Sequence, residues 1–135
     1  MRVIVAHLHT LSARLHFWMV EYAEGCSVCL PKPLAPLSTL HTDHEPTEAV
    51  PHPAQMIRPI AERLGLEPED LSVASASLGW VESPGEWAPV ALLRIDGDQL
   101  PELEGGTFIS LMDLLKVPIT ERMLLREAYE ALLGH

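Results

Sequence analysis

Short apolar runs separated by polar turns indicate most of the strands of this chain. Residues 3–9 are apolar and β-branched, and a second apolar run covers residues 15–22 after a short polar link, so the two predict an antiparallel hairpin. The runs at 71–80 and 87–95 are joined by a Ser-Pro-Gly turn at 83–85 and predict a second hairpin.

Two segments carry the apolar spacing of helices. Residues 55–64 are followed by Gly65, which suits the left-handed residue that ends a helix. Pro59 is tolerated in a first turn but not in a helix interior, so we expect the regular helix to begin near Arg58 or to kink there. The second helix is predicted at 121–133.

The C-terminal part is predicted as a short strand at 107–109, one or two helical turns at 111–115, and then the helix 121–133. We expect Thr120 to cap this helix and Gly134 to end it. Its apolar stripe should pack across a sheet. The stripe consists of Leu124, Leu125, Ala128, Tyr129 and Leu132.

The segment between the first hairpin and the first helix, residues 31–53, is rich in proline. It holds six prolines and shows no sustained period, so it predicts a long loop. Long loops in compact domains are uncommon and tend to be functional or disordered, which makes this loop the first place to look for a site. The complete order predicts an α+β domain with a mixed sheet, β-β-loop-α-β-β-β-α.

Composition limits the classes of partner. The 135 residues suit one domain with one core, and 47% of them are hydrophobic. A net charge of −10 would oppose binding to a phosphate backbone, so we expect no nucleic-acid partner. No window is long and apolar enough for a membrane span or a secretory signal, which favours a cytoplasmic protein.

The first predicted helix resembles part of the box of the Nudix (MutT-like) superfamily, G-x5-E-x7-R-E-U-x-E-E-x-G-U, where U is a bulky aliphatic residue. Five of the seven specified positions in the second half match. Leu30-Pro31 and residues 108–115 are similar to further family segments, in the right order. The resemblance implies an α/β/α sandwich over residues 1–135. The matching residues are Arg58, Ile60, Glu62, Gly65 and Leu66.

The box is degenerate at its carboxylates. Pro59 and Arg63 occupy two of the glutamate positions, and the upstream glutamate and glycine positions fall on Val50 and His44. The family hydrolyses nucleoside diphosphate derivatives with a divalent metal held by these glutamates. Hard cations such as Mg²⁺ require several oxygen ligands, and a guanidinium next to Glu62 opposes a cation there. The resemblance therefore implies the fold more than the chemistry.

These residues support one leading hypothesis and one alternative from the same family. The leading hypothesis is a non-catalytic module that binds a nucleotide-like anion or a protein partner, without a cofactor, with Arg58 and Arg63 as the ligand-binding residues because arginine grips phosphate bidentately. The alternative is a working Mg²⁺-dependent hydrolase in which Glu62 is joined by Glu45 and Glu48 from the loop.

A second alternative is a small zinc-stabilised interaction protein. Cys26, Cys29, His41 and His44 form a C-x2-C-x11-H-x2-H pattern, close to a tetrahedral zinc site, although buried structural cysteines are the commoner outcome.

Two further sets of aromatic residues are open to a structural or a functional reading. The first-hairpin histidines His7, His9 and His16 could pair across the turn, or could simply be half-buried sheet residues. The three tryptophans could stack on a base, pack in the core or form a homodimer interface. They are Trp18, Trp80 and Trp87.

Overall fold

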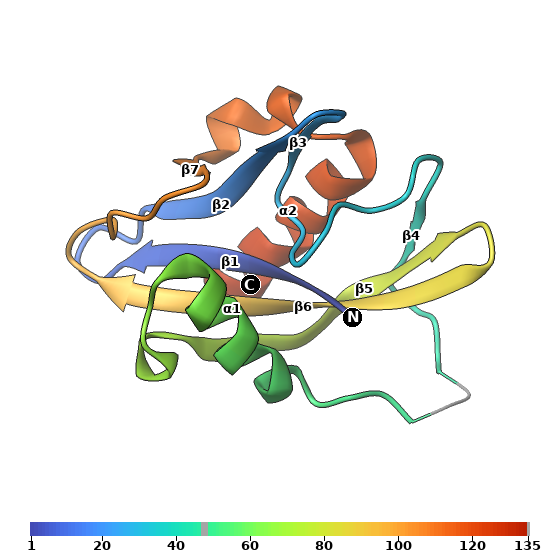
Figure 1. Cartoon of the computed structure of the whole chain (residues 1–135), viewed down its shortest axis with the longest axis horizontal. Helices are drawn as coiled ribbons and strands as arrows, with labels where there is room; N and C mark the ends of the chain where they lie inside the picture. Colours follow the sequence, from blue (N-terminus) through green and yellow to red (C-terminus); the bar gives the residue numbers. More distant parts are fainter. Residues whose placement is uncertain (47–48, 135) are drawn as a thin grey trace.

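A computed structural model describes residues 1–46 and 49–134 of the chain. Its strands form one mixed sheet in the order β3-β2-β1-β6-β5-β4, and β7 also pairs with β2 (Figure 1). The strands are β1 (Arg2–His9), β2 (Leu15–Tyr22), β3 (Gly25–Ser27), β4 (Thr39–His41), β5 (Ser72–Ser83), β6 (Glu86–Gly97) and β7 (Thr107–Ile109).

Both predicted hairpins are confirmed, and one parallel contact joins them. β1 pairs antiparallel with β2, and β5 pairs antiparallel with β6 through two register irregularities. β1 and β6 run parallel along eight consecutive residue pairs, from Arg2 opposite Val90 to His9 opposite Gly97. β1 is therefore central and buried on both faces, which explains its nearly continuous apolar run.

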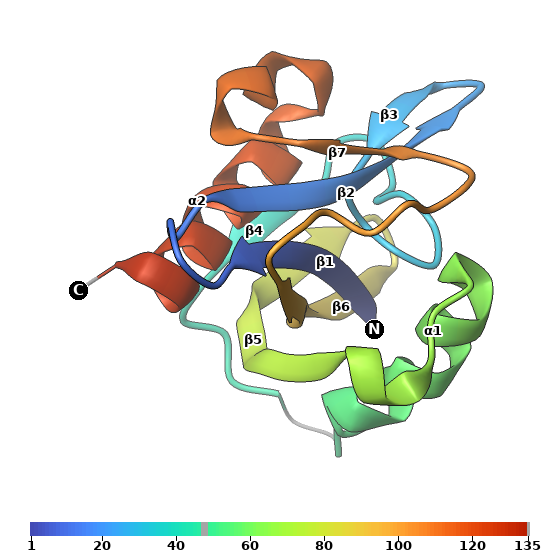
Figure 2. The same ribbon diagram turned by 90° about the vertical axis from the view of Figure 1, so that its left-hand side faces the viewer.

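The two helices cover opposite faces of this sheet, as Figure 2 shows. The first is α1 (Ile57–Leu64), preceded by a 3₁₀ helix η1 (Pro53–Met56), and the second is α2 (Ile119–Leu133). Side chains of β1 alternate between the two layers: Val3 and Val5 pack in the cluster under α1, while Ile4 and Ala6 pack in the cluster under α2. The predicted α+β fold with a helix on each face is confirmed.

The start and end of α1 follow the sequence closely. Pro59 lies in the first turn, where its missing N–H is harmless, and Gly65 ends the helix with a φ of 74°. Within residues 1–46 and 49–134, no helix is long and apolar enough to cross a membrane.

Two expectations for the C-terminal helix are wrong. α2 begins at Ile119 with Pro118 as its N-cap, and the Thr120 hydroxyl donates to the Ser38 carbonyl at 2.7 Å instead of capping. Tyr129 is 38% exposed, because the buried stripe turns through Leu124, Leu125 and Ala128 and begins at Glu121. Gly134 does end the helix.

The proline-rich segment contains a strand that the sequence did not predict. It contains β4, which adds an edge strand to β5 with Leu40 opposite Val81. Three residues are too few to show a period in sequence, and the pairing partner lies about forty positions away along the chain, so only the tertiary structure reveals this strand. The helical turns predicted at 111–115 form the 3₁₀ helix η3 (Leu111–Lys116), which is kinked at Asp113. A further 3₁₀ helix, η2 (Pro68–Asp70), precedes β5.

Candidate functional site

The helix α1 presents the box residues that the sequence singled out to solvent. Ile60, Ala61 and Leu64 are buried against the sheet, which leaves Arg58 and Glu62 on the exposed side. Within the described part of the chain, these two side chains form no ion pair with each other.

Two of the three carboxylates proposed for a rebuilt metal site, Glu45 and Glu62, lie among the described residues. Glu45 is exposed on the loop, and Glu48 lies outside the described residues. Among residues 1–46 and 49–134, no group of three or more His, Cys, Asp or Glu side chains is placed to hold a metal ion. Since Mg²⁺ requires several oxygen ligands, the donors described around α1 do not fit it.

Arg63 is held by the protein itself. Its guanidinium donates to the Pro31 carbonyl through Nη1 and to the Tyr22 hydroxyl through Nη2, the latter at 3.2 Å. These contacts tie the end of α1 to β2 and to the segment that follows β3. Two of the five donors of Arg63 are thus used within the chain, and its expected role in ligand binding stays a prediction, as does that of Arg58.

The four zinc candidates lie in two different places. Cys29 is fully buried and Cys26 packs beside it in the apolar cluster under α2. Burial raises the pKa of the Cys29 thiol well above its usual value, with a further contribution from the Glu121 carboxylate, so the thiolate that a metal needs is disfavoured. His41 and His44 lie on the other face of the sheet, with aromatic neighbours.

An aromatic cluster forms where β4, β5 and β6 meet the loop that leads to α1. The His44 ring stacks on the Trp87 indole at 4.0 Å and 12°, and it meets the Trp80 ring edge-on at 5.0 Å. His41 contacts Trp87 at 4.9 Å, and its Nε2 lies 3.0 Å from Glu82 Oε1. Residues from three strands and one loop therefore share one set of stacked rings.

These rings form one wall of a recess of about 480 Å³. The alternation of side chains along β6 explains where the recess lies. Ala91 and Leu93 pack in the cluster under α1, and Pro89 and Trp87 lie on the same face of the sheet but outside that cluster, so they line the recess. The remaining lining comes from Met1, Pro46 and residues 49–51, which end two residues before η1. The sequence showed the tryptophans but not their histidine partners, since ring stacking across elements leaves no periodic signal.

A larger pocket of about 1000 Å³ lies on the α2 side, between the β2–β3 hairpin, the loop at 33–38 and the start of α2. Glu121 forms part of its floor and is almost fully buried, accepting hydrogen bonds from the Ser27 hydroxyl at 2.9 Å and the Val28 amide at 2.7 Å. Burial raises the pKa of the Glu121 carboxyl, and these two hydrogen bonds oppose the rise. Sequence reasoning missed Glu121, although an acid three residues before Leu124 on an apolar stripe was a readable signal.

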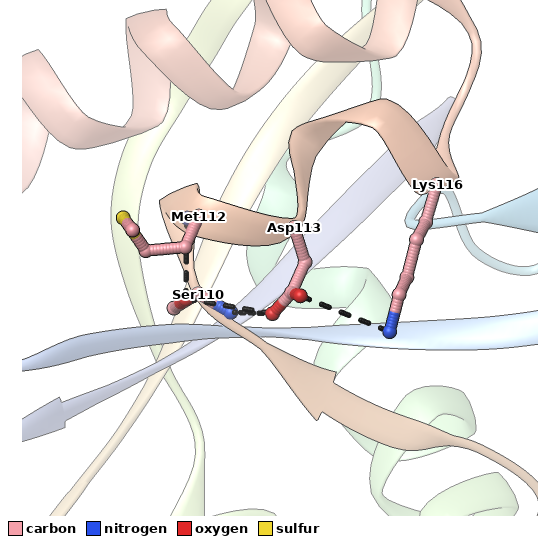
Figure 3. Close-up of polar contacts among 4 residues, drawn as sticks. All are labelled: Ser110, Met112, Asp113 and Lys116. Atoms are coloured by element: carbon pink, nitrogen blue, oxygen red, sulfur yellow. Dashed lines mark hydrogen bonds and ion pairs between the residues drawn. The ribbon is translucent and has the colours of Figure 1, made fainter.

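Lys116, the last residue of η3, lines this pocket. Figure 3 shows the polar contacts within η3 that involve it. The Ser110 hydroxyl accepts from the Met112 amide at 3.2 Å, and the Ser110 amide donates to Asp113 at 3.2 Å, so the two side chains form a capping box. The other Asp113 oxygen lies 3.8 Å from the ammonium group of Lys116, a lining residue. The box and this ion pair together orient Lys116 at the rim.

The first-hairpin histidines do pair across the sheet. His7 lies directly opposite His16 and is almost fully buried on the α1 face, with its ring 6.3 Å from that of Phe108. Within the described part of the chain, neither ring nitrogen of His7 has a hydrogen-bond partner. Burial lowers the pKa of His7, followed by the neighbouring His16 and His9.

Comparison with known proteins identifies the fold and no closer relationship. No protein-family model matches the sequence, and no curated protein matches it. The crystal structure of an Ap4A hydrolase from C. elegans superposes with a TM-score of 0.51 and 14% identity, over 94% of this chain and 93% of that one. This likeness supports the fold that the sequence resemblance implied. The architecture described above is therefore a Nudix-like fold.

Proposed function

We propose that this domain binds a nucleotide-like anion in the aromatic recess and does not hydrolyse it by the metal chemistry of the Nudix box. The observation that supports this most directly is the stack of His44 on Trp87, with Trp80 edge-on beside it. Flat aromatic walls in a concave site suit a planar base. Trp87 is 41% exposed, which leaves indole surface for a ligand to cover.

Basic groups near this recess suit the anionic part of such a ligand. Burial and then the nearby cation of Arg2 lower the pKa of the Met1 amine, the Glu86 carboxylate opposes this shift, and Lys32 adds a smaller lowering effect, so the cations that this region offers are the side chains of Arg2 and Lys32. Arg58 is exposed in the first turn of α1, seven residues after the lining residue Pro51. In a chain of net charge −10, such groups provide a local attraction for phosphate.

The box supports binding without the family chemistry. Glu62 is followed by Arg63, and Pro59 replaces the glutamate after Arg58, so the helix offers one carboxylate in place of a cluster. The neighbour of known structure is named for its action on Ap4A, a nucleotide, which supports the ligand class. Nucleotide recognition and metal-dependent cleavage rest on different residues, so one can be retained while the other is lost.

Calorimetric titration with ADP and AMP, with and without Mg²⁺, tests the proposal. We expect ADP to bind without Mg²⁺, and Trp87→Ala to weaken it about tenfold or more, since stacking on an aromatic side chain contributes about 1–3 kcal/mol per base. Tyr129→Ala is the matched control. Tyr129 is 38% exposed, close to the 41% of Trp87, and it lies on α2, which covers the other face of the sheet.

Three outcomes would reject the proposal. Equal ADP affinity in wild type and Trp87→Ala would place any nucleotide elsewhere. Release of phosphate products that requires Mg²⁺ and disappears in Glu62→Gln would instead establish the hydrolase alternative. If ADP and AMP fail to bind at all, the nucleotide assignment is wrong.

A further inference from the structure

Arg2 is a buried cation that the protein itself satisfies poorly. The residue is 7% exposed, and its Nε atom has no hydrogen-bond partner among residues 1–46 and 49–134. The ion pair from its Nη2 to Oε1 of Glu86 is long, at 3.8 Å, and the Glu86 side chain is 49% exposed. Burial of a charge is costly unless the charge is both paired and hydrogen-bonded, so a guanidinium in this state requires an explanation.

Arg2 lies where β1 begins and β6 continues without it. The parallel pairing of the two strands starts at Arg2 opposite Val90, whereas β6 itself starts at Glu86. In the described part of the chain, no strand pairs with residues 86–89 of β6 on that side. Figure 1 shows the β5–β6 hairpin extending past the N-terminus. Beyond the start of β1, therefore, no strand on that side of β6 separates the two faces of the sheet.

This end of the sheet brings Arg2 close to the aromatic recess. Met1, the residue before Arg2, lines the recess, and so does Trp87, the residue after Glu86. Because side chains alternate along strands, Arg2 lies on the α2 face with Ile4, whereas Trp87 lies on the α1 face. The recess and the ion pair of Arg2 therefore flank the same end of β6 from its two faces, with Met1 between them.

The charges around Arg2 are basic on balance. Beyond the effect of burial, Arg2, Glu86 and Lys32 all act on the pKa of the Met1 amine, so these three side chains lie around the first residue. Arg2 also acts on the Cys29 thiol, but burial raises the pKa of that thiol well above its usual value, so the thiol stays neutral. Two cationic side chains thus face one carboxylate, in a protein of net charge −10.

We propose that Arg2, assisted by Lys32, binds the phosphate groups of a nucleotide whose base lies in the aromatic recess, an assignment that rests on the proposed function. A phosphate supplies the acceptors that the Arg2 guanidinium lacks, and arginine presents its donors as a fork that fits two phosphate oxygens. The Glu86 carboxylate competes with the ligand for Arg2, because both are anions. The site therefore selects nucleotides over nucleosides.

Calorimetric titration of the purified protein with adenosine, ADP and inorganic pyrophosphate, all without Mg²⁺, tests the proposal. We expect Arg2→Met to weaken ADP and pyrophosphate about tenfold or more, since hydrogen bonds between charged groups are the stronger ones, and to leave adenosine unchanged. Arg14→Met is the matched control. Arg14 is exposed in the turn between β1 and β2, at the other end of β1, and its loss changes the net charge equally.

Two further measurements separate binding from folding. Arg2→Met replaces a poorly satisfied buried charge by an apolar side chain, so it should unfold at the same temperature as wild type or a higher one. Glu86→Gln removes the competing carboxylate and should strengthen ADP binding roughly twofold to fivefold, the usual range for one half-exposed ion pair. Glu130→Gln, exposed on α2, makes the same change in net charge and should leave ADP binding unchanged.

Three results would overturn the assignment of Arg2. One is equal binding of ADP and pyrophosphate to Arg2→Met and to wild type. A second is an equal loss of adenosine and ADP in Arg2→Met, which a structural disturbance would produce. The third is a loss of ADP binding in Arg58→Met alone, which would place the phosphate at α1.

The result at Trp87 is independent of the result at Arg2. If Trp87→Ala weakens ADP and Arg2→Met does not, the base site stands and the phosphate site is wrong. If pyrophosphate binding requires Arg2 but Trp87→Ala binds ADP normally, the anion site stands and the base site is wrong. Failure of both ADP and pyrophosphate to bind wild type rejects both.

Discussion

The imidazole of His44 lies parallel to the indole of Trp87, with ring centroids 4.0 Å apart and an interplanar angle of 12°. His44 belongs to the loop before η1, and Trp87 to β6, so this contact fixes the loop against the sheet. The stack covers one part of the indole and leaves another part exposed. It therefore both shapes the recess and connects it to the chain that leads into α1.

We expect His44→Ala to uncover Trp87. Of the three tryptophans, Trp18 is almost fully buried, so a change in quenching reports on Trp80 and Trp87. Acrylamide quenching of tryptophan fluorescence should increase in the variant while the far-ultraviolet circular dichroism stays unchanged. If quenching equals that of wild type, the loop is not held by this stack.

The contacts of Arg63 predict a structural role. Arg63→Ala removes donors to Tyr22 and Pro31 and should lower the free energy of unfolding by about 1 kcal/mol, the usual net effect of such hydrogen bonds. Arg58→Ala, on the same helix, is the comparison and should change stability little. Urea denaturation measures both. A larger loss in Arg58→Ala would contradict the assignment.

The buried Glu121 predicts a loss of protein stability as the pH rises. This is the opposite of the effect of an acid whose pKa is lowered by folding. Burial raises its pKa above the ordinary value of 4.5, so its protonated form is favoured in the folded state. The stabilising contribution is therefore present below pH 4.5 and lost as the pH rises through the raised folded pKa.

The variant Glu121→Gln isolates this effect. Its stability relative to wild type should increase as the pH rises through that window, because the amide does not ionise. The exposed Glu130→Gln serves as the control and should show no such trend. Denaturation at a series of pH values gives both differences, and a pH-independent difference for Glu121→Gln would contradict the prediction.

The buried His7 predicts acid sensitivity. Its pKa lies below the ordinary value of 6.5, mainly because the ring is buried, so its contribution to stability is present above pH 6.5 and lost as the pH falls through the lowered folded pKa. The Asp96 carboxylate and, to a smaller extent, the backbone of Gln99 favour the protonated ring, but burial outweighs both in setting the pKa of His7.

We expect His7→Leu to reduce the loss of stability below pH 6.5. At neutral pH the variant should be as stable as wild type or more stable, since an unsatisfied buried polar group costs about 1–3 kcal/mol. The midpoint of thermal unfolding from pH 7.5 down to about 5 tests both points, in the range where histidine titrates. An unchanged pH dependence would show that another group is responsible.

The zinc alternative can be tested by metal removal. Cys29 is buried with a raised thiol pKa, and the histidines of the pattern contact tryptophans, so we expect EDTA to leave the unfolding midpoint unchanged. Elemental analysis of the purified protein should find no stoichiometric zinc. One zinc per chain, with unfolding on chelation, would restore that hypothesis.

The sequence by itself determined the elements whose signal is local. Apolar alternation gave the four long strands, and Gly65 and Gly134 marked the ends of both helices because these effects depend on neighbouring residues. The degenerate box at Arg58 and Glu62 indicated the Nudix-like fold.

Only the tertiary structure decided which distant side chains meet. The strand β4 exists because β5 offers an edge for it to pair with. The aromatic cluster forms only when one loop and the three strands β4, β5 and β6 come together. The burial of Glu121 by Ser27 and Val28, ninety-odd positions away, has the same origin. Contacts of this kind depend on packing across the sheet, and no periodicity along the chain encodes them.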